Sequence, residues 1–259
     1  MHTDPGTFVW HDLTTSDAPA AQTFYRRLLG WGTASGGPGY AFFTLGDAPI
    51  AGVVLDPAAC AAAAPFWMGN VGVTDVDAAA ERARRLGGTV AMGPADIPGV
   101  GRFAVLADPA GAAFSVFAAK DAPRPGAENC AGEARGPGRF CWSELRTRDP
   151  EAALAFYGEL LGWRRARSID LGAENGSYVI FANAEGRELG GMVRPNPGAG
   201  QEPRPHWFHY LEVRDLEATV QHVEALGGSI DVPPMPIPGG GAMAHCRDPQ
   251  GAPFGLSSE

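Results

Sequence analysis

Two tryptophans are each followed, two residues later, by a carboxylate: Trp10 by Asp12, and Trp142 by Glu144. Residues two apart in a β-strand point to the same face of the sheet, so each pair would set an acid beside an aromatic ring. A carboxylate in such a setting can act as a general base toward a bound molecule. Glu144 is the first candidate for this role, and Asp12 is the second.

Candidate acids lie further along the chain. Tyr210 and His245 can both exchange protons with a substrate, and strand alternation places His245 on the inner face, whereas His209 should point toward the helices. Glu144, His206 and His245 could also form a metal site, although three loosely spaced ligands occur together by chance more often than they form a site. The sequence leaves two interpretations open: a pocket without a metal, and a metal site formed by Glu144, His206 and His245.

The tryptophan–carboxylate pairs open a stretch that the chain repeats. The stretches WHDLTTSDAPAAQTFYRRLLGW, from Trp10, and WSELRTRDPEAALAFYGELLGW, from Trp142, are identical at 12 of 22 positions. In each copy an aspartate, Asp17 or Asp149, precedes an apolar stripe at helical spacing that contains a Phe-Tyr pair and ends at glycine. Extended stretches lie on both sides. The pattern predicts a strand, a helix with a buried Phe-Tyr pair, and several further strands.

Two weaker copies of this pattern follow the stronger ones. Asp75 and Asp215 each precede an amphipathic helix closed by Leu-Gly-Gly, and each copy continues through an Ile-Pro-Gly loop to a D-P-x-G turn at Asp108 or Asp248. The sequence therefore predicts four units. We expect two domains, at residues 1–122 and 137–259, joined by a Pro- and Gly-rich linker at 123–136.

This pattern of four units resembles the vicinal oxygen chelate superfamily, which includes glyoxalase I, bleomycin resistance proteins and extradiol dioxygenases. The resemblance rests on the Asp-capped helices with Phe-Tyr, the Leu-Gly-Trp endings and the D-P-x-G turns, and it covers nearly the whole chain. More narrowly, the chain is similar to fused two-domain members described as hydroxylase-like or glyoxalase-like. The resemblance implies an α+β fold in which four βαβββ units form two cupped-sheet domains in tandem.

The resemblance also indicates where metal ligands would lie. Members of the superfamily usually take a His from the first strand of each of two units and a Glu from the last strand. The corresponding residues are Trp10, Met68 and Ser115 in the first domain, and Trp142, Phe208 and Gly255 in the second. None of them supplies an imidazole nitrogen or a carboxylate oxygen, so we expect no metal and no other cofactor.

The residues expected to face the two cups suggest a ligand instead. Aromatic walls with a few polar groups are typical of pockets for small, partly apolar organic molecules. The expected ligand-binding residues are Trp10, Met68, Asn70, Ser115, Trp142 and Phe208. The first interpretation is binding of an aromatic metabolite or antibiotic without a metal, the second is an acid–base enzyme (isomerase, cyclase, lyase or hydroxylase-like), and a regulatory or scaffold protein is a third.

Composition excludes other classes of partner. The 259 residues carry a formal charge of −9 and no basic cluster longer than two arginines, which argues against nucleic acid. No apolar run of about 18 residues and no signal-peptide pattern is present, so we expect a cytoplasmic monomer or homodimer without membrane contact. The four cysteines (Cys60, Cys130, Cys141 and Cys246) form no C-x-x-C pair and are expected to be reduced and structural.

Overall fold

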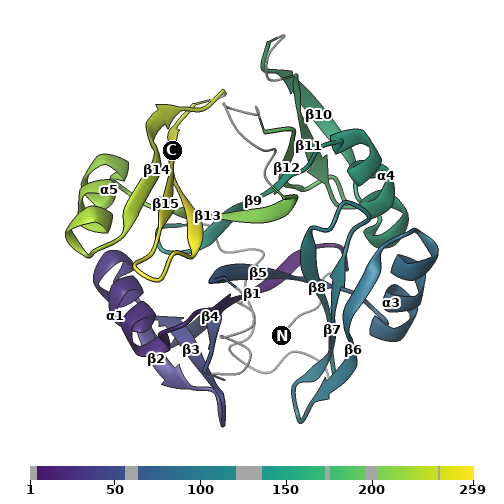
Figure 1. Ribbon diagram of the computed structural model, residues 1–259, viewed down its shortest axis with the longest axis horizontal. Coiled ribbons are helices and arrows are strands. Elements are labelled where there is room, and N and C mark those ends of the chain that lie inside the picture. Colours follow the sequence, from purple (N-terminus) through teal and green to yellow (C-terminus); the bar gives the residue numbers. More distant parts are fainter. Residues whose placement is uncertain (1–4, 56–63, 121–135, 173–175, 196–203, 239) are drawn as a thin grey trace. The chain divides into compact units, whose positions relative to one another are not determined.

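Four βαβββ repeats make up the fold of the computed structural model (Figure 1), which describes residues 5–55, 64–120, 136–172, 176–195, 204–238 and 240–259. The first repeat contains β1 (Phe8–Thr14), α1 (Ala18–Leu29), β2 (Gly32–Ser35), β3 (Tyr40–Leu45) and β4 (Ala48–Val54). The second contains β5 (Phe66–Gly72), α3 (Val76–Arg85), β6 (Thr89–Ile97), β7 (Gly101–Ala107) and β8 (Ala113–Ala119). The predicted order of elements is confirmed in both.

The second half of the chain has the same order. The third repeat contains β9 (Phe140–Arg146), α4 (Pro150–Leu161), β10 (Arg164–Asp170), β11 (Ser177–Ala182) and β12 (Glu188–Val193). The fourth contains β13 (His206–Glu212), α5 (Leu216–Ala225), β14 (Ser229–Pro236), β15 (Ala242–Arg247) and β16 (Pro253–Ser258).

The predicted aspartates begin all four helices. The Asp17 carboxylate accepts a hydrogen bond from the Ala20 amide at 3.0 Å, and Asp149 accepts from two amides of the first turn of α4. Asp75 and Asp215 do the same for α3 and α5, each at 2.9 Å. These carboxylates satisfy amide hydrogens that have no partner within the helix, so the aspartates fix where each helix starts.

The strands form two mixed sheets of eight strands each. Their orders are β2-β3-β4-β1-β5-β8-β7-β6 and β10-β11-β12-β9-β13-β16-β15-β14. Within each repeat the first strand pairs in parallel with the last, as in β9 with β12 and β13 with β16, and the remaining pairs are antiparallel. Helices and strands thus give an α+β fold, as predicted.

The chain divides into two compact units that do not coincide with the two sheets. The first unit comprises Met1–Val9, Gly69–Glu128 and Trp142–Trp207, and the second comprises Trp10–Met68, Asn129–Cys141 and Phe208–Glu259. Each unit joins two repeats through their helices, α3 with α4 in the first unit and α1 with α5 in the second. The boundaries at residues 122 and 137 remain predictions, and most of the expected linker lies outside the described residues.

A buried hydrogen-bond network in each compact unit explains why the chain repeats its Phe-Tyr pairs and D-P-x-G turns. In the second unit, the Tyr25 hydroxyl donates to Asp248 at 3.3 Å and accepts from the indole of Trp67 at 3.0 Å. In the first unit Tyr157, Asp108 and Trp207 repeat this arrangement at 3.2 and 3.1 Å. In each unit the tyrosine of one repeat therefore stabilises the D-P-x-G turn of the other repeat.

Burial changes the acidity of these groups. It raises the pKa of both Tyr25 and Tyr157 well above the usual value, and the neighbouring aspartates add to this effect. Burial also raises the pKa of Asp108 and Asp248, against the opposing effect of backbone amides that donate to each carboxylate. The predicted core position of the two Phe-Tyr pairs is confirmed, since all four rings are at most 5% exposed.

The cysteines that can be described are free thiols. Cys141 is half-buried and Cys246 is fully buried, while Cys60 and Cys130 lie outside the described residues. Burial raises the pKa of the Cys246 thiol to about 12, which keeps it protonated and unreactive.

Candidate functional site

Trp10 and Asp12 lie together on the face of β1 opposite the helix, as their spacing predicts, and a tyrosine joins them. The Trp10 indole donates to Asp12 Oδ1 at 3.0 Å and to the Tyr40 hydroxyl at 2.8 Å. The Tyr40 hydroxyl in turn donates to Asp12. Burial, and then the Asp12 carboxylate, raise the pKa of Tyr40 far above its usual value, so this hydroxyl remains a donor.

The third repeat builds the same arrangement around Glu144. The Trp142 indole donates to the Tyr178 hydroxyl at 2.8 Å, and this hydroxyl donates to Glu144 Oε2 at 3.1 Å. Arg146 adds an ion pair, with its Nε 2.9 Å from Glu144 Oε1. Glu144 is 8% exposed, and both of its carboxylate oxygens accept hydrogen bonds from the protein itself.

A glycine of the neighbouring strand makes room for each tyrosine. A Cβ on Gly52 of β4 would lie 1.7 Å from the Tyr40 hydroxyl oxygen, and a Cβ on Gly191 of β12 would lie 2.1 Å from the Tyr178 ring. No other side chain fits at these two positions while the tyrosines stay in place. The glycines therefore belong to the networks as much as the residues that make the hydrogen bonds.

The fourth repeat carries an aromatic cluster with an imidazole. The Tyr210 hydroxyl and His245 Nε2 share a hydrogen bond of 2.9 Å, and the Phe208 ring lies 4.9 Å from the His245 ring between centroids. Gly255 again makes room, since a Cβ there would lie 2.2 Å from the Tyr210 ring. The sequence predicted Tyr210 and His245 as candidate acids, and the two side chains are in direct contact.

The remaining predicted lining residues are smaller. Asn70 of β5 and Ser115 of β8 are buried partners in the parallel register of the first compact unit, at 7% and 2% exposure. Met68 is half-buried and belongs, with Trp10, to the second compact unit.

The other histidines of the sequence analysis have structural surroundings. His206 Nδ1 lies 2.8 Å from the carbonyl oxygen of Arg204. His11 is buried, stacks on Phe140 at 3.8 Å between ring centroids and meets the edge of His209 at 4.6 Å. Burial, and then His209, lower the pKa of His11 well below its usual value.

The residues at the expected metal positions do not fit a metal ion. Trp10 and Trp142 use their indole N–H groups as hydrogen-bond donors, and the space beside Gly255 is filled by the Tyr210 ring. Tryptophan, methionine, phenylalanine and glycine side chains offer no nitrogen or oxygen lone pair to a divalent cation. Within the described ranges, no three His, Cys, Asp or Glu side chains gather in a way that could hold one.

Three contributors to these networks were missed by the sequence analysis: Tyr40, Tyr178 and Arg146. A signal for the tyrosines was present, because each stands directly before the apolar run of its strand, in YAFFTL and SYVIFA. The glycines opposite them also recur, in APIAGVV and ELGGMV. Tyrosine and glycine at matching places in both copies would have predicted the pairing.

A family model agrees with this architecture. The model for the Glyoxalase/Bleomycin resistance protein/Dioxygenase superfamily matches residues 7–116 and again residues 139–256. The chain belongs to this superfamily. Its two sheets correspond to two tandem domains of the family, and the resemblance stated from the sequence is confirmed.

Relatives match over nearly the full chain. The protein named "Putative glyoxylase CFP32" of Mycobacterium tuberculosis is 35% identical, over 97% of this chain and 94% of the relative. The anthracycline biosynthesis proteins DauV of Streptomyces sp. strain C5 and DnrV of Streptomyces peucetius are each 34% identical, over 97% of this chain and 93% of the relative.

Solved structures share the fold at low identity. The Mn(II)-bound glyoxalase from Novosphingobium aromaticivorans has a TM-score of 0.66 at 16% identity, covering 98% of this chain and 82% of that chain. The 2,2',3-trihydroxybiphenyl 1,2-dioxygenase from Sphingomonas wittichii has a TM-score of 0.67 at 16% identity, covering 99% and 91%. No helix of the described residues is long and apolar enough to cross a membrane.

Proposed function

We propose that this protein binds a small, partly aromatic organic molecule and needs no metal ion to do so. The proposal rests on the hydrogen bonds that the two tryptophans at expected metal positions donate. Trp10 and Trp142 direct their only side-chain donors into hydrogen bonds with Tyr40 and Tyr178. A side chain that donates a hydrogen bond from its single nitrogen cannot ligate a cation at that atom.

The chemistry of the three clusters supports an aromatic ligand. Trp142 and Tyr178 are half-buried rings beside a carboxylate, and the half-buried His245 ring packs against the buried rings of Phe208 and Tyr210. Such surfaces bind flat, partly apolar molecules by ring contact and select among them by a few hydrogen bonds.

The relatives narrow the ligand class. Two proteins that are similar to this chain over almost its full length are named for anthracycline biosynthesis. An aromatic intermediate or product of secondary metabolism, carrying hydroxyl or carbonyl groups on fused rings, agrees with both that name and the aromatic clusters. The protein would sequester such a molecule or deliver it to another step.

One observation favours a second candidate function, acid–base catalysis on the bound molecule. Tyr210 and His245 share a hydrogen bond of 2.9 Å, and a hydroxyl–imidazole pair can donate and accept a proton in one cycle. Such a pair suits an isomerisation, cyclisation or hydration. Glu144 suits the base role less, because Arg146 and Tyr178 already donate to its carboxylate.

The primary test is calorimetric titration with 1,8-dihydroxyanthraquinone as the probe, with and without a chelator and with added Mn²⁺ or Zn²⁺. We expect saturable binding that neither treatment changes. Binding that appears only with an added divalent ion would overturn the metal-free proposal.

Two variants separate binding from catalysis. Glu144→Gln and Tyr210→Phe keep the shape of each cluster but remove an ionisable group, and Glu224→Gln, on the exposed face of α5, is the control. For an enzyme, loss of the acid or base lowers turnover by about a hundredfold or more with little change in affinity. For a binding protein, only affinity changes, by about 1 kcal/mol for one hydrogen bond.

A further inference from the structure

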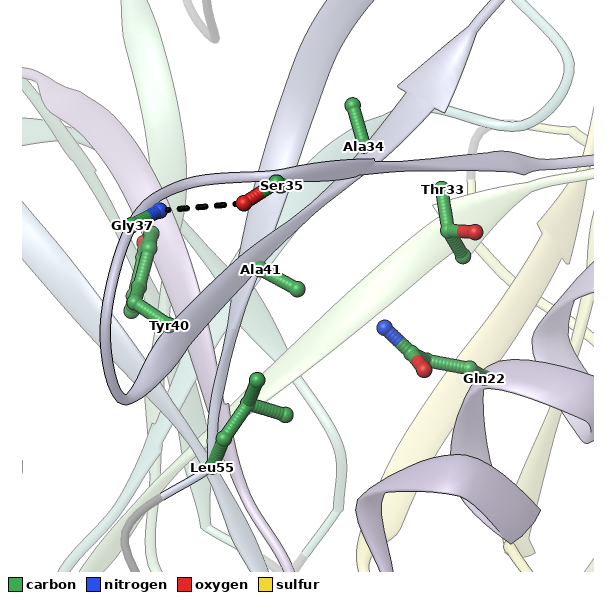
Figure 2. A pocket seen from close by; sticks show the side chains of 8 residues that line it. All are labelled: Gln22, Thr33, Ala34, Ser35, Gly37, Tyr40, Ala41 and Leu55. Carbon is green, nitrogen blue, oxygen red and sulfur yellow. Dashed lines mark hydrogen bonds between the residues drawn. The ribbon is translucent and has the colours of Figure 1, made fainter.

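An open cavity lies between α1 and the β2–β3 hairpin of the first repeat, and five of its eight described lining residues are exposed. Its volume is about 300 Å³, and its lining combines side chains of α1, β2 and β3 with the residue that follows β4. Figure 2 shows the Gln22 side chain extending from α1 toward Thr33 and Ala41 on the strands. The lining residues are Gln22, Thr33, Ala34, Ser35, Gly37, Tyr40, Ala41 and Leu55.

This cavity and the Trp10–Asp12–Tyr40 network share Tyr40 but lie on opposite faces of the sheet. Neighbouring residues of a strand point to opposite faces, so Tyr40 and Ala41 of β3 direct their side chains to different sides of the sheet. Ala41 belongs to the apolar cluster that includes α1 residues such as Phe24, which places it on the helix-covered face. The Tyr40 hydroxyl lies on the other face, with Trp10 and Asp12.

The third repeat has the same backbone elements, and it fills the same place. Counting from the capping aspartates Asp17 and Asp149, Gln22 of α1 corresponds to Leu154 of α4. Counting from the matched Tyr40 and Tyr178, Ala41 corresponds to Val179. Leu154 packs against the apolar cluster of its compact unit, and Val179 is 1% exposed.

The hairpin side of this place carries an ion pair to the helix in the third repeat. Ser35 pairs with Ala41, and Ser168 pairs with Val179, so the two serines correspond. Arg165 lies three residues before Ser168, donates to its hydroxyl at 3.0 Å and forms an ion pair with Glu151 of α4. The first repeat has Thr33 opposite Phe43 where the third has Arg165 opposite Phe181, and a threonine cannot reach across to the helix.

The position between the helix and the hairpin is thus open in the first repeat and filled in the third. The residues that line the open position are polar and uncharged or apolar. The eight lining residues that the structure describes include a carboxamide and two aliphatic hydroxyls, beside apolar Ala41 and Leu55, and none of them carries a charge at neutral pH. Groups of this kind both donate and accept hydrogen bonds but offer no charge to pair with a charged ligand.

We propose that this cavity is a second binding site, which takes a neutral, hydroxylated small molecule such as a sugar or cyclitol ring. Its volume is at the lower end of small-molecule pockets, which span about 300 to 1,000 Å³, so one ring of this kind suits it better than a fused polycyclic system. The inference goes beyond the proposed function, and it holds whether or not the aromatic clusters bind a ligand.

The test is a nuclear magnetic resonance titration of the full chain with methyl α-D-glucopyranoside and with myo-inositol, and with glucose 6-phosphate and glucosamine as charged counterparts. We expect saturable shifts of the Gln22 side-chain amide and of the backbone amides of Thr33 and Leu55 with at least one neutral probe. We expect the charged counterparts to bind no more tightly than the neutral probes, since the described lining residues offer no opposite charge.

Variants that copy the third repeat supply the structural control. Gln22→Leu with Ala41→Val should abolish the shifts, because it fills the cavity with the residues that the chain already uses at the matching positions. Gln22→Leu alone should weaken binding at least about tenfold and avoids any packing change in the strand. Thr23→Ala, on the exposed side of the same helix, should leave binding unchanged.

Three outcomes would overturn the proposal: no saturable shift with either neutral probe, tighter binding of a charged counterpart than of the neutral probes, or unchanged binding in the filled variant. Melting temperatures identify any variant that fails to fold. If the double variant fails to fold, the result for Gln22→Leu alone decides.

Discussion

Tyr178 lies directly against Gly191, so that a Cβ on the glycine would come within 2.1 Å of the tyrosine ring. The same ring ends in the hydroxyl that connects Trp142 to Glu144. The geometry of the aromatic cluster in the third repeat therefore depends on Gly191, which has no side chain with which to make a hydrogen bond.

This relationship predicts the effect of Gly191→Ala. The added methyl group displaces Tyr178 and breaks its bonds to Trp142 and Glu144, so we expect a loss of about 1–3 kcal/mol in the free energy of unfolding. Denaturant unfolding monitored by circular dichroism measures it. Gly93→Ala is the control, because no atom lies within 4 Å of its Cβ position, and its stability should change by less than about 0.5 kcal/mol. Equal effects of the two variants would contradict the prediction.

The Tyr–Asp–Trp networks predict matched losses in the two compact units. Tyr25→Phe and Tyr157→Phe each leave a buried carboxylate and a buried indole N–H with one partner fewer. We expect each change to lower stability by about 1–3 kcal/mol. Thr23→Ala removes an exposed hydroxyl bonded to a helix carbonyl and should cost little. A loss below about 0.5 kcal/mol in both tyrosine variants would show that these networks add no stability.

Stability should depend on pH through His11. Its pKa is lowered in the folded protein, so below the unfolded value of about 6.5 the unfolded chain binds a proton that the folded chain does not. The free energy of unfolding therefore falls as the pH falls below about 6.5, by up to about 1.4 kcal/mol per pH unit for one group.

The measurement is the difference in this slope between the wild type and His11→Phe, which keeps a ring against Phe140 but does not titrate. The raised pKa values of Asp108 and Asp248 act in the opposite sense, since the folded state takes up those protons first, and they cancel in the difference. An unchanged slope in His11→Phe would assign the acid sensitivity elsewhere.

Removal of divalent metal ions should leave the melting temperature unchanged. We expect purified protein to contain far less than one equivalent of zinc, iron, nickel or manganese per chain, because tryptophan, methionine, phenylalanine and glycine occupy five of the six expected ligand positions. Elemental analysis and melting curves with and without a chelator check this. One tightly bound divalent ion per domain, with a lower melting temperature after chelation, would refute the expectation.

Local signals allowed most of the fold to be predicted from the sequence. Asp17 and Asp149 act on amides two or three residues away, and the Phe-Tyr stripes follow from helical spacing, so short windows contain the needed information. The four repeats were visible because the same local signals recur.

The partners of those residues could not be predicted in the same way. Tyr25 bonds to Asp248 and Tyr157 to Asp108, and no local pattern links residues so far apart in the chain. The candidate site shows the same limit. Strand alternation placed Trp142 and Glu144 on one face, but Tyr178 and Arg146 became visible as partners only once strand register was known.

The division into compact units has a consequence for synthesis on the ribosome. The first unit contains no residue beyond Trp207, whereas the second joins α1 and its strands to β13–β16, which follow α1 by most of the given chain. The apolar face of α1, with Phe24 and Tyr25, must therefore wait for Phe254 and Leu256 before it is fully covered. Until then the apolar face of α1 is open to association with other chains, so a chaperone that binds nascent chains would find a target at Phe24 and Tyr25.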